Sequence, residues 1–275
     1  MSISSSGGSI GPGAGTRNGN GGLATYGSPF FDPSSQYLPP SYKEMFRWCS
    51  FLAHSNSTIS PIIKKKASYS ITKLVYNSDN QVAVNGWKDL LESNLRLPEM
   101  EYKLLLDYET YGNAFCSVFY PFDRYLVCPH CEEETLARTM KWAYKNHEFE
   151  GSCPSCKKTA KFTAKDRHVN NRARVKLIRW YPKYIDIDYN PFSDTSTYIY
   201  RIPSQVRKRI ADSSHGRNKD LVGETPLSVL KAVKEKSNIK LRSDNIYHMK
   251  HEGISHEDQA FGMPPILPVF KDVWL

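Results

Sequence analysis

Four cysteines in two short repeats are the residues of this sequence best suited to bind a metal ion. Cys128 and Cys131 form one Cys-Pro-x-Cys turn, and Cys153 and Cys156 form a second. In such a turn both sulfurs can face one point, and two turns supply the four thiolates of a tetrahedral zinc site. We therefore expect these four cysteines to hold one Zn²⁺ in a small zinc ribbon.

A site of this composition is expected to be structural. A catalytic zinc keeps one coordination position open for water or substrate, and four thiolates leave none. Metal binding is expected to stabilise the folded insert by on the order of 10 kcal/mol, because the segment has few apolar residues. Either His130 or His147 could replace a cysteine as a ligand, and an iron–sulfur cluster is the other use for four cysteines.

Some carboxylates and histidines are weaker candidates for metal binding or catalysis. A strand would place Asp186 and Asp188 on one face, where they could bind Mg²⁺ together with Asp194, as in a nuclease. The alternative is simple alternation, with isoleucines inward and aspartates outward. Three histidines form a loose cluster in sequence, but their spacing fits neither one helix face nor a zinc signature. They are His248, His251 and His256.

No sequence motif indicates an enzyme. The chain has no phosphate loop, nucleophile elbow or glycine-rich dinucleotide turn. It also has no apolar run near the roughly 20 residues of a membrane span and no export signal. An intracellular, reducing location follows as the default, and there paired cysteines bind metals more often than they form disulfides. Cys49 and Cys116 are expected in the core.

The charge balance favours an anionic partner. Lysine and arginine number 37 against 28 acidic residues, so the formal net charge is +9. Nucleic acid is the expected partner, and a solvated basic surface is the alternative. Between residues 157 and 179, Asp166 is the only acid among nine basic residues. This run could contact phosphates, or it could be a solvated face of the ribbon.

Helix signals are clear in the first half of the chain. Ser41 and Glu44 form a capping box, and a second short helix begins at Ser60-Pro61. Another helix is expected around Trp87. The next runs from Pro98 to its glycine stop at Gly112. Later, Thr225 is expected to cap a helix that starts with a proline in its first turn.

Strand signals alternate with these helices. Residues 67–76, 114–120 and 245–251 are predicted strands from their β-branched and aromatic content. Two hairpins are expected: 162–167 with 174–180, and 184–189 with 195–202. The stretch around Ser213 should be an exposed loop. An amphipathic helix beginning at Pro264 stops at Leu275 without a C-cap, so we expect a truncated or split chain.

The order of these segments resembles the portal proteins of tailed bacteriophages. The similarity lies in the helix from Ser41 followed by ISPIIKKKA at 59–67, and in the helix-to-strand step YETYGNAF at 108–115. It is strongest at 244–274, where DNIYHMK leads to FGMPPIL, as in the passage from a wing strand to a long helix. The zinc ribbon departs from the general portal pattern.

This resemblance implies an α+β fold of portal-wing-like helices and antiparallel strands, into which the four-cysteine zinc ribbon expected from the cysteine spacing is inserted. We expect four regions: a Gly/Ser-rich arm that is disordered by its composition (1–36), a first portal-like part (37–126), the zinc-ribbon insert (127–166) and a second portal-like part (167–275) that ends at the start of a truncated helix. We expect the ribbon to carry the zinc ligands and no region to carry catalysis.

The implied function is a homo-oligomeric ring, usually dodecameric, at one capsid vertex, through which double-stranded DNA is packaged and ejected. The implied partners are the major capsid protein, the terminase, and head-completion or tail-connector proteins, with no membrane. The location is the virion, after assembly in the host cytoplasm. The alternative from a different class is a zinc-ribbon regulator that binds nucleic acid through the basic run.

Overall fold

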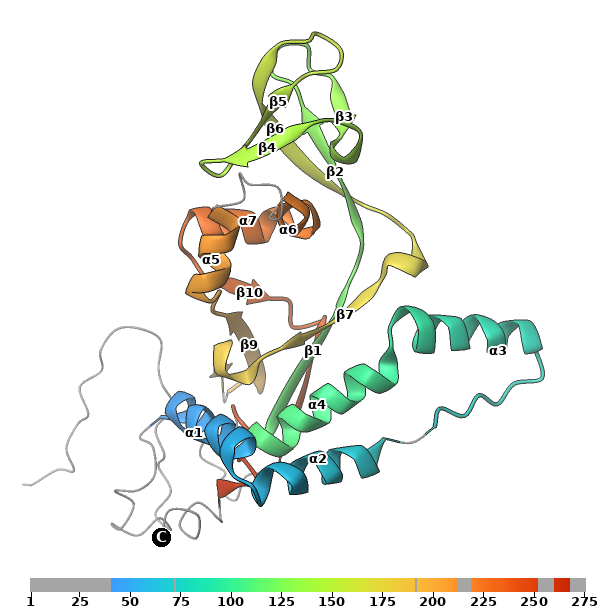
Figure 1. Ribbon diagram of the computed structural model, residues 1–275, viewed down its shortest axis with the longest axis vertical. Helices are drawn as coiled ribbons and strands as arrows, with labels where there is room; N and C mark the ends of the chain where they lie inside the picture. Colours follow the sequence, from blue (N-terminus) through green and yellow to red (C-terminus); the bar gives the residue numbers. More distant parts are fainter. Residues whose placement is uncertain (1–40, 72, 191, 212–218, 252–259, 268–275) are drawn as a thin grey trace, which may run out of the picture.

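The molecule is α+β, with helices at one end, a ribbon of strands at the other and two antiparallel sheets between them (Figure 1). The computed structural model describes residues 41–71, 73–190, 192–211, 219–251 and 260–267. Three predictions lie outside these residues: the disordered arm, the loop around Ser213, and the final helix beyond Leu267. Between Pro264 and Leu267 the chain forms a turn.

Three helices, α1 (Tyr42–Ser55), α2 (Ile59–Ser70) and α4 (Leu97–Tyr111), share one apolar cluster at the lower end of Figure 1. The side chain of Ser41 caps α1 by accepting from the backbone N–H of Glu44 at 3.4 Å, as predicted. Met45, Phe46 and Cys49 on α1 are fully or almost fully buried. They pack with Tyr111 and with the 260–267 segment. Between α2 and α4 the chain forms α3 (Gln81–Lys88) and the π-helical turn η2 (Asp89–Asn94), which contribute no buried residue to this cluster.

The predicted strand at 67–76 is wrong. Residues 67–70 continue α2, and the described residues that follow, 71 and 73–76, are not in a strand. Ala67 is fully buried one helical turn after the buried Ile63, so burial of one helix face outweighs the β propensity of the neighbouring residues. The Nζ of Lys66 also binds the Oε2 of Glu109 on α4 at 2.7 Å, which fixes this end of α2.

Two three-stranded antiparallel sheets form the middle of the molecule. The first has the order β11-β1-β7, and the second has the order β10-β9-β8. In the second sheet Ile185 lies opposite Tyr200, which confirms the predicted hairpin. The strands are β1 (Asn113–Phe119), β7 (Lys176–Trp180), β8 (Ile185–Asn190), β9 (Thr195–Tyr200), β10 (Ile239–Leu241) and β11 (Ile246–Lys250).

A five-stranded sheet of order β3-β2-β6-β5-β4 forms the ribbon end. The predicted hairpin of 162–167 with 174–180 is wrong, because β6 pairs with β2 and β5 whereas β7 pairs with β1. β1 and β2 run end to end, and β6 and β7 return beside them. The strands are β2 (Phe122–Val127), β3 (Glu134–Leu136), β4 (Trp142–Lys145), β5 (Glu148–Ser152) and β6 (Thr159–His168).

Three short helices pack against the ribbon sheet: α5 (Ser204–Ala211), α6 (Lys219–Glu224) and α7 (Leu227–Lys234). Ile210, Val222 and Leu230 share one buried cluster with Tyr144 and Phe149 of the sheet. The ribbon therefore does not fold around its own side chains alone. None of the helices in the described part of the chain has the length and apolar composition of a membrane span.

The predicted capping role of Thr225 is also wrong. Its hydroxyl donates to the carbonyl oxygen of Leu221 at 2.6 Å. The first free N–H of α7, that of Leu227, instead donates to the Oδ2 of Asp166 at 2.8 Å. A carboxylate from the opposing sheet thus caps α7, where the helix dipole favours a negative charge.

Candidate metal centre

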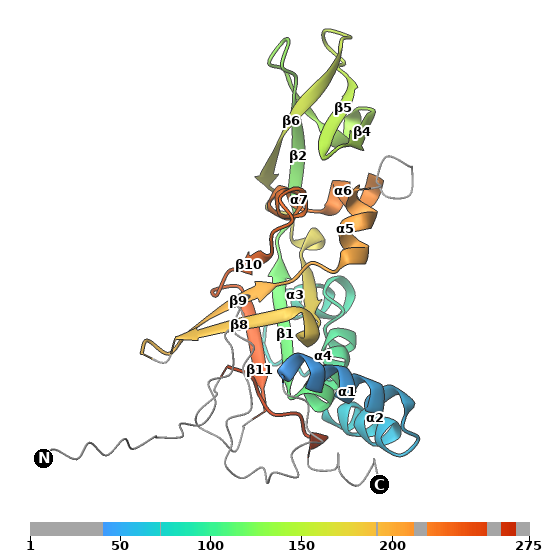
Figure 2. The same ribbon diagram turned by 90° about the vertical axis from the view of Figure 1, so that its left-hand side faces the viewer.

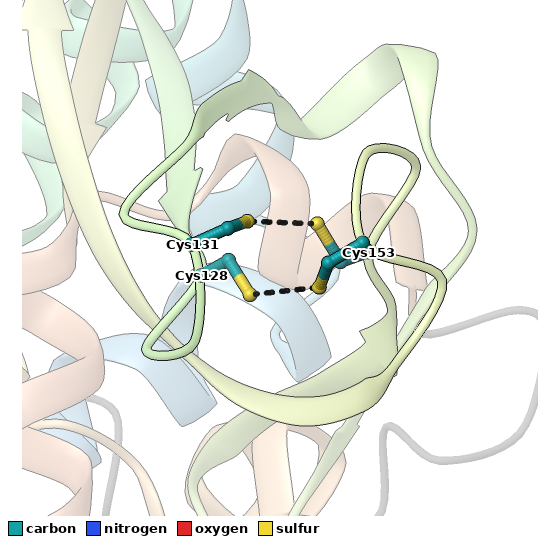
Figure 3. A group of neighbouring side chains, drawn as sticks. Cys128, Cys131 and Cys153 are labelled. Carbon is teal, nitrogen blue, oxygen red and sulfur yellow. Dashed lines mark hydrogen bonds between the residues drawn. The ribbon is translucent and has the colours of Figure 1, made fainter.

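The four cysteines meet at one point between the ends of β2 and β5 (Figure 3). Their sulfurs all lie within 4.8 Å of one another. The Sγ atoms of Cys128 and Cys156 are 3.8 Å apart, and those of Cys131 and Cys153 are 3.6 Å apart. A tetrahedron with Zn–S bonds of about 2.3 Å has edges of about 3.8 Å, whereas a disulfide bond is about 2.05 Å. The spacing fits a shared metal ion.

The same backbone geometry builds both turns. Four residues after the first cysteine the backbone is left-handed, with φ of 57° at Glu132 and 59° at Lys157. The N–H of each of these residues donates to the carbonyl of Cys128 or Cys153 at 2.9 Å. Each first cysteine in turn donates its own N–H to a carbonyl five residues later, at 3.0 Å in both cases. The two turns are thus structural repeats as well as sequence repeats.

Backbone N–H groups favour thiolates at this point, whereas burial opposes them. Cys128 and Cys153 are buried, Cys156 is half-buried and Cys131 is exposed. Backbone N–H groups, first that of Cys156, lower the pKa of Cys153 to about 7. The N–H of Glu133 acts in the same direction on Cys131. At Cys131, however, desolvation and the neighbouring thiols outweigh this N–H and raise the pKa of the thiol to about 12. Four crowded sulfurs therefore need a cation before all can ionise.

The donor set fits Zn²⁺ without help from histidine. Among the described residues, the four cysteines are the one group of three or more potential ligands that comes together. His130 is exposed. The ring of His147 lies 6.2 Å from that of Tyr144, and its buried Nδ1 has no hydrogen-bond partner in the structure. Neither histidine belongs to the cluster, so four sulfurs close the site.

The aspartates considered for Mg²⁺ do not converge on one site. Asp186 forms ion pairs with Lys43 and Arg201. Asp188 is exposed, and Asp194 accepts from the hydroxyl of Tyr189 at 3.1 Å. Ile185, next to Asp186, is fully buried. The aspartates and isoleucines of β8 therefore alternate between the two faces of the strand, as in an ordinary half-buried strand.

His248 is a half-buried hydrogen-bonding residue and is not part of a metal cluster. Its ring stacks on Phe115 with centroids 4.2 Å apart. Nε2 lies 3.0 Å from the Oδ1 of Asn113, and Nδ1 lies 3.3 Å from the hydroxyl of Tyr198. Burial lowers the pKa of His248 to about 4, and the charge of Lys250 acts in the same direction. The ring of His251 packs beside that of Tyr108, and His256 is outside the described residues.

The sequence alone did not reveal one important pair, Arg124 and Asp166. The guanidinium of Arg124 binds both carboxylate oxygens of Asp166, at 2.8 and 3.0 Å. It also donates to the carbonyls of Val222 and Thr225, at 2.7 and 2.6 Å. The pair joins the ribbon to α6 and α7. The one available signal was that Asp166 is the single acid in a basic run.

Much of that basic run is ion-paired. Lys161 binds Glu148 at 2.7 Å, and Lys165 binds Glu134 at 2.8 Å. Arg174 lies 2.8 Å from an acid of β2, Asp123. Lys157 and Lys158 are exposed beside the second cysteine turn. The ion-paired side chains favour the solvated-face interpretation over a phosphate-binding strip.

Comparison with known proteins provides no relative from which to transfer a role. No family model, curated protein or solved structure matches this chain. The functional argument therefore depends on the residues and their geometry. The geometry gives an α+β chain with a four-cysteine cluster that could hold a metal ion such as zinc.

Proposed function

We propose that this chain is a subunit of a portal ring, through which double-stranded DNA enters and leaves a viral capsid. The observation that carries the proposal is a joint between two segments far apart in sequence. These are the helix-to-strand step at 108–115 and the glycine-containing segment at 260–267. Both belong to the segment order that resembles portal proteins. Their contact supports the view that the segments act as one unit.

The joint depends on two glycines in direct contact. Gly112 ends α4 with φ of 66°, and a Cβ there would lie 2.1 Å from the carbonyl oxygen of Met263. A Cβ on Gly262 would lie 2.3 Å from the carbonyl oxygen of Gly112. The N–H of His251 donates to that same oxygen at 2.7 Å. The end of α4, the end of β11 and the final described segment therefore converge where no side chain fits.

Asn113 completes the joint through its buried amide. Its Oδ1 accepts from the backbone N–H of Gly262 at 2.7 Å. Its Nδ2 donates to the carbonyls of Tyr111 and Gly262, both at 2.7 Å. Three hydrogen bonds from one fully buried side chain fix the chain as it leaves the sheet. In a portal subunit this is where a wing strand passes into the long helix.

The proposed role places the protein at one vertex of the virion, after assembly in the host cytoplasm. Its partners in this role are other copies of itself, the major capsid protein, the terminase, head-completion or tail-connector proteins, and the DNA in the channel. The role needs no reaction at this chain, since the terminase would supply the work of packaging.

The proposed metal is one structural Zn²⁺ held by Cys128, Cys131, Cys153 and Cys156. When bound, the ion supplies charge that keeps four thiolates together and closes the ribbon. Because the first cysteine of each turn lies in the cluster shared with α5–α7, the ion would also support those helices. The protein residues at the site hold structure and offer no open coordination position for a substrate.

Electron microscopy and native mass spectrometry of the full-length protein test the proposed function. We expect closed rings with a single dominant subunit number. A protein that stays monomeric across micromolar concentrations, with and without DNA, would contradict the portal proposal. Stoichiometric zinc in the same preparation tests the metal separately.

The second candidate, a zinc-ribbon regulator, depends on the exposed Lys157 and Lys158. Lys161 and Lys165 support this candidate less, because both side chains already form ion pairs with glutamates of the ribbon. It predicts sequence-selective DNA binding by the monomer, with affinity falling steeply as salt rises. Neutralising Lys157, Lys158 and Lys161 together would then weaken binding. Unchanged DNA affinity in that variant rules out this candidate.

A further inference from the structure

The hairpin of β8 and β9 ends in an apolar side chain that no other described residue covers. Phe192, in the turn of this hairpin, is 99% exposed. The turn is nevertheless ordered by local bonds: the N–H of Phe192 donates to the Oδ1 of Asn190 at 3.0 Å, and Tyr189 donates to Asp194 at 3.1 Å. A phenyl ring held in water by an ordered turn suggests a contact with another molecule.

The charge of this hairpin is opposite to that of the chain. Between Ile185 and Tyr200 there are three aspartates and no lysine or arginine, although the chain carries a net charge of +9. Asp186 is already paired with Lys43 and Arg201. Asp188 and Asp194 remain exposed on either side of Phe192. The tip therefore combines one apolar side chain with two acidic flanks and fits a basic surface that has an apolar centre.

The outer face of α2 has that complementary composition. α2 contains three lysines and no acid. Ile62, Lys65 and Tyr69 lie at helical spacing on one exposed face, with Ile62 59% and Tyr69 72% exposed. The Nζ of Lys65 lies 5.6 Å from the centre of the Tyr69 ring. Lys64 is exposed beside them.

The two surfaces lie on opposite flanks of the molecule. Figure 2 shows the β8–β9 hairpin projecting to the left and α2 at the lower right. A contact between them within one chain is therefore excluded by the structure. Between chains, a contact joining two different patches is head-to-tail, and repetition of such a contact closes into a ring when the rotation allows.

We infer that the β8–β9 tip of one copy docks on the outer face of α2 in the next copy, with Phe192 between Ile62 and Tyr69. This inference rests on the proposed ring and names the residues of its subunit contact. Asp188 and Asp194 then face the lysines of α2, which sets the orientation of the contact. The partner is a second copy of this chain, because the chain itself carries both complementary surfaces.

Substitutions at the two surfaces of the full-length chain test the contact, and the mass of the oligomer is the measured quantity. We expect Phe192→Asp to raise the concentration needed for assembly by at least about tenfold. Lys65→Glu and Asp188→Lys should each weaken assembly, and the double variant should regain much of it. Lys240→Glu is the matched control, since it reverses an exposed lysine on β10, and it should assemble normally. Unchanged circular dichroism shows that each variant folds.

The outcomes separate this inference from the proposed function. If the wild type forms rings and Phe192→Asp forms them equally well, the tip contact is wrong while the ring stands. If the single variants weaken assembly and the exchanged pair restores it, but the assemblies are open filaments, the contact is right and the portal proposal is wrong. A wild type that never assembles overturns both.

Discussion

Arg124 and Asp166 lie directly opposite each other on β2 and β6 and form a two-point ion pair. The Arg124 side chain is 2% exposed, and Asp166 also accepts the first N–H of α7. The guanidinium further lies over the ring of Phe149. Both residues belong to the sheet, and their bonds to Val222, Thr225 and Leu227 hold the sheet and the helices together.

Removal of the Asp166 charge is predicted to destabilise this end of the molecule strongly. In Asp166→Asn, Arg124 keeps its charge inside the protein without a carboxylate, and α7 loses an anionic cap. Breaking one side of a buried pair costs roughly 3–5 kcal/mol. Urea unfolding should show this loss in the free energy of unfolding.

An exposed ion pair in the same sheet provides the control for that measurement. Lys161 pairs with Glu148, but its side chain is 68% exposed. Lys161→Gln should change stability by less than about 1 kcal/mol. Equal effects of the two substitutions would show that the Arg124 pair has no special structural role.

Acidification is predicted to weaken the protein through His248. The pKa of this histidine is about 4 in the folded state and about 6.5 when unfolded, so the unfolded state binds more protons between these values. The contribution of His248 to the free energy of unfolding is fully present above pH 6.5. It decreases as the pH falls towards 4 and does not change further below that pH. The shift corresponds to roughly 3 kcal/mol over that window.

His248→Phe separates this effect from the titration of carboxylates in the same window. The variant keeps a ring against Phe115 but cannot be protonated. Its free energy of unfolding should depend less steeply on pH between 6.5 and 4 than that of the wild type. Parallel curves for the two proteins would mean that His248 titrates normally.

Local signals predicted several elements correctly. Ser41 caps α1, and Gly112 ends α4, because a short polar side chain and a residue tolerant of positive φ act within one turn of chain. The cysteine cluster was predictable for the same reason: each turn brings two sulfurs together locally. The hairpin of β8 and β9 also has its turn residues between its strands.

The errors arose where distant residues decide the structure. The 67–70 stretch is helical because Ala67 is buried, which depends on a partner helix. β6 and β7 do not pair because β2 and β1 lie beside them, and no local pattern specifies those partners. The cap on α7 comes from Asp166, 61 residues earlier in the chain. Single-sequence patterns carry little information on such pairings.

Two glycine substitutions are predicted to have opposite effects. Gly112→Ala places a methyl group 2.1 Å from the carbonyl oxygen of Met263 at φ of 66°. It should cost at least about 2 kcal/mol of stability. A Cβ on Gly86 in α3 would meet nothing within 4 Å, so Gly86→Ala should stabilise by about 0.5–1 kcal/mol through helix propensity. Thermal unfolding of both variants measures the difference, and a tolerated Gly112→Ala would contradict the close packing of the joint.

Removal of the proposed Zn²⁺ is predicted to loosen the ribbon and the α5–α7 helices together, while α1 and α4 stay folded. Cys128 and Cys153 belong to the buried cluster that contains Ile210, Val222 and Leu230. The residues of α1 lie in a different cluster with Tyr111. Without the cation the cysteines take up protons and no ion ties the two turns together, which loosens the first cluster and leaves the second intact.

Hydrogen exchange of the zinc-loaded and chelator-treated protein measures this separation peptide by peptide. Exchange should rise in β4 and β5 and also in α7, with little change in α1. Cys131→Ser should reproduce the pattern and lower the zinc content. Cys49→Ser should leave the zinc content unchanged, because burial raises the pKa of Cys49 to about 12 and keeps that thiol neutral in the α1 cluster. Exchange confined to the cysteine turns would show that the metal does not support the helices.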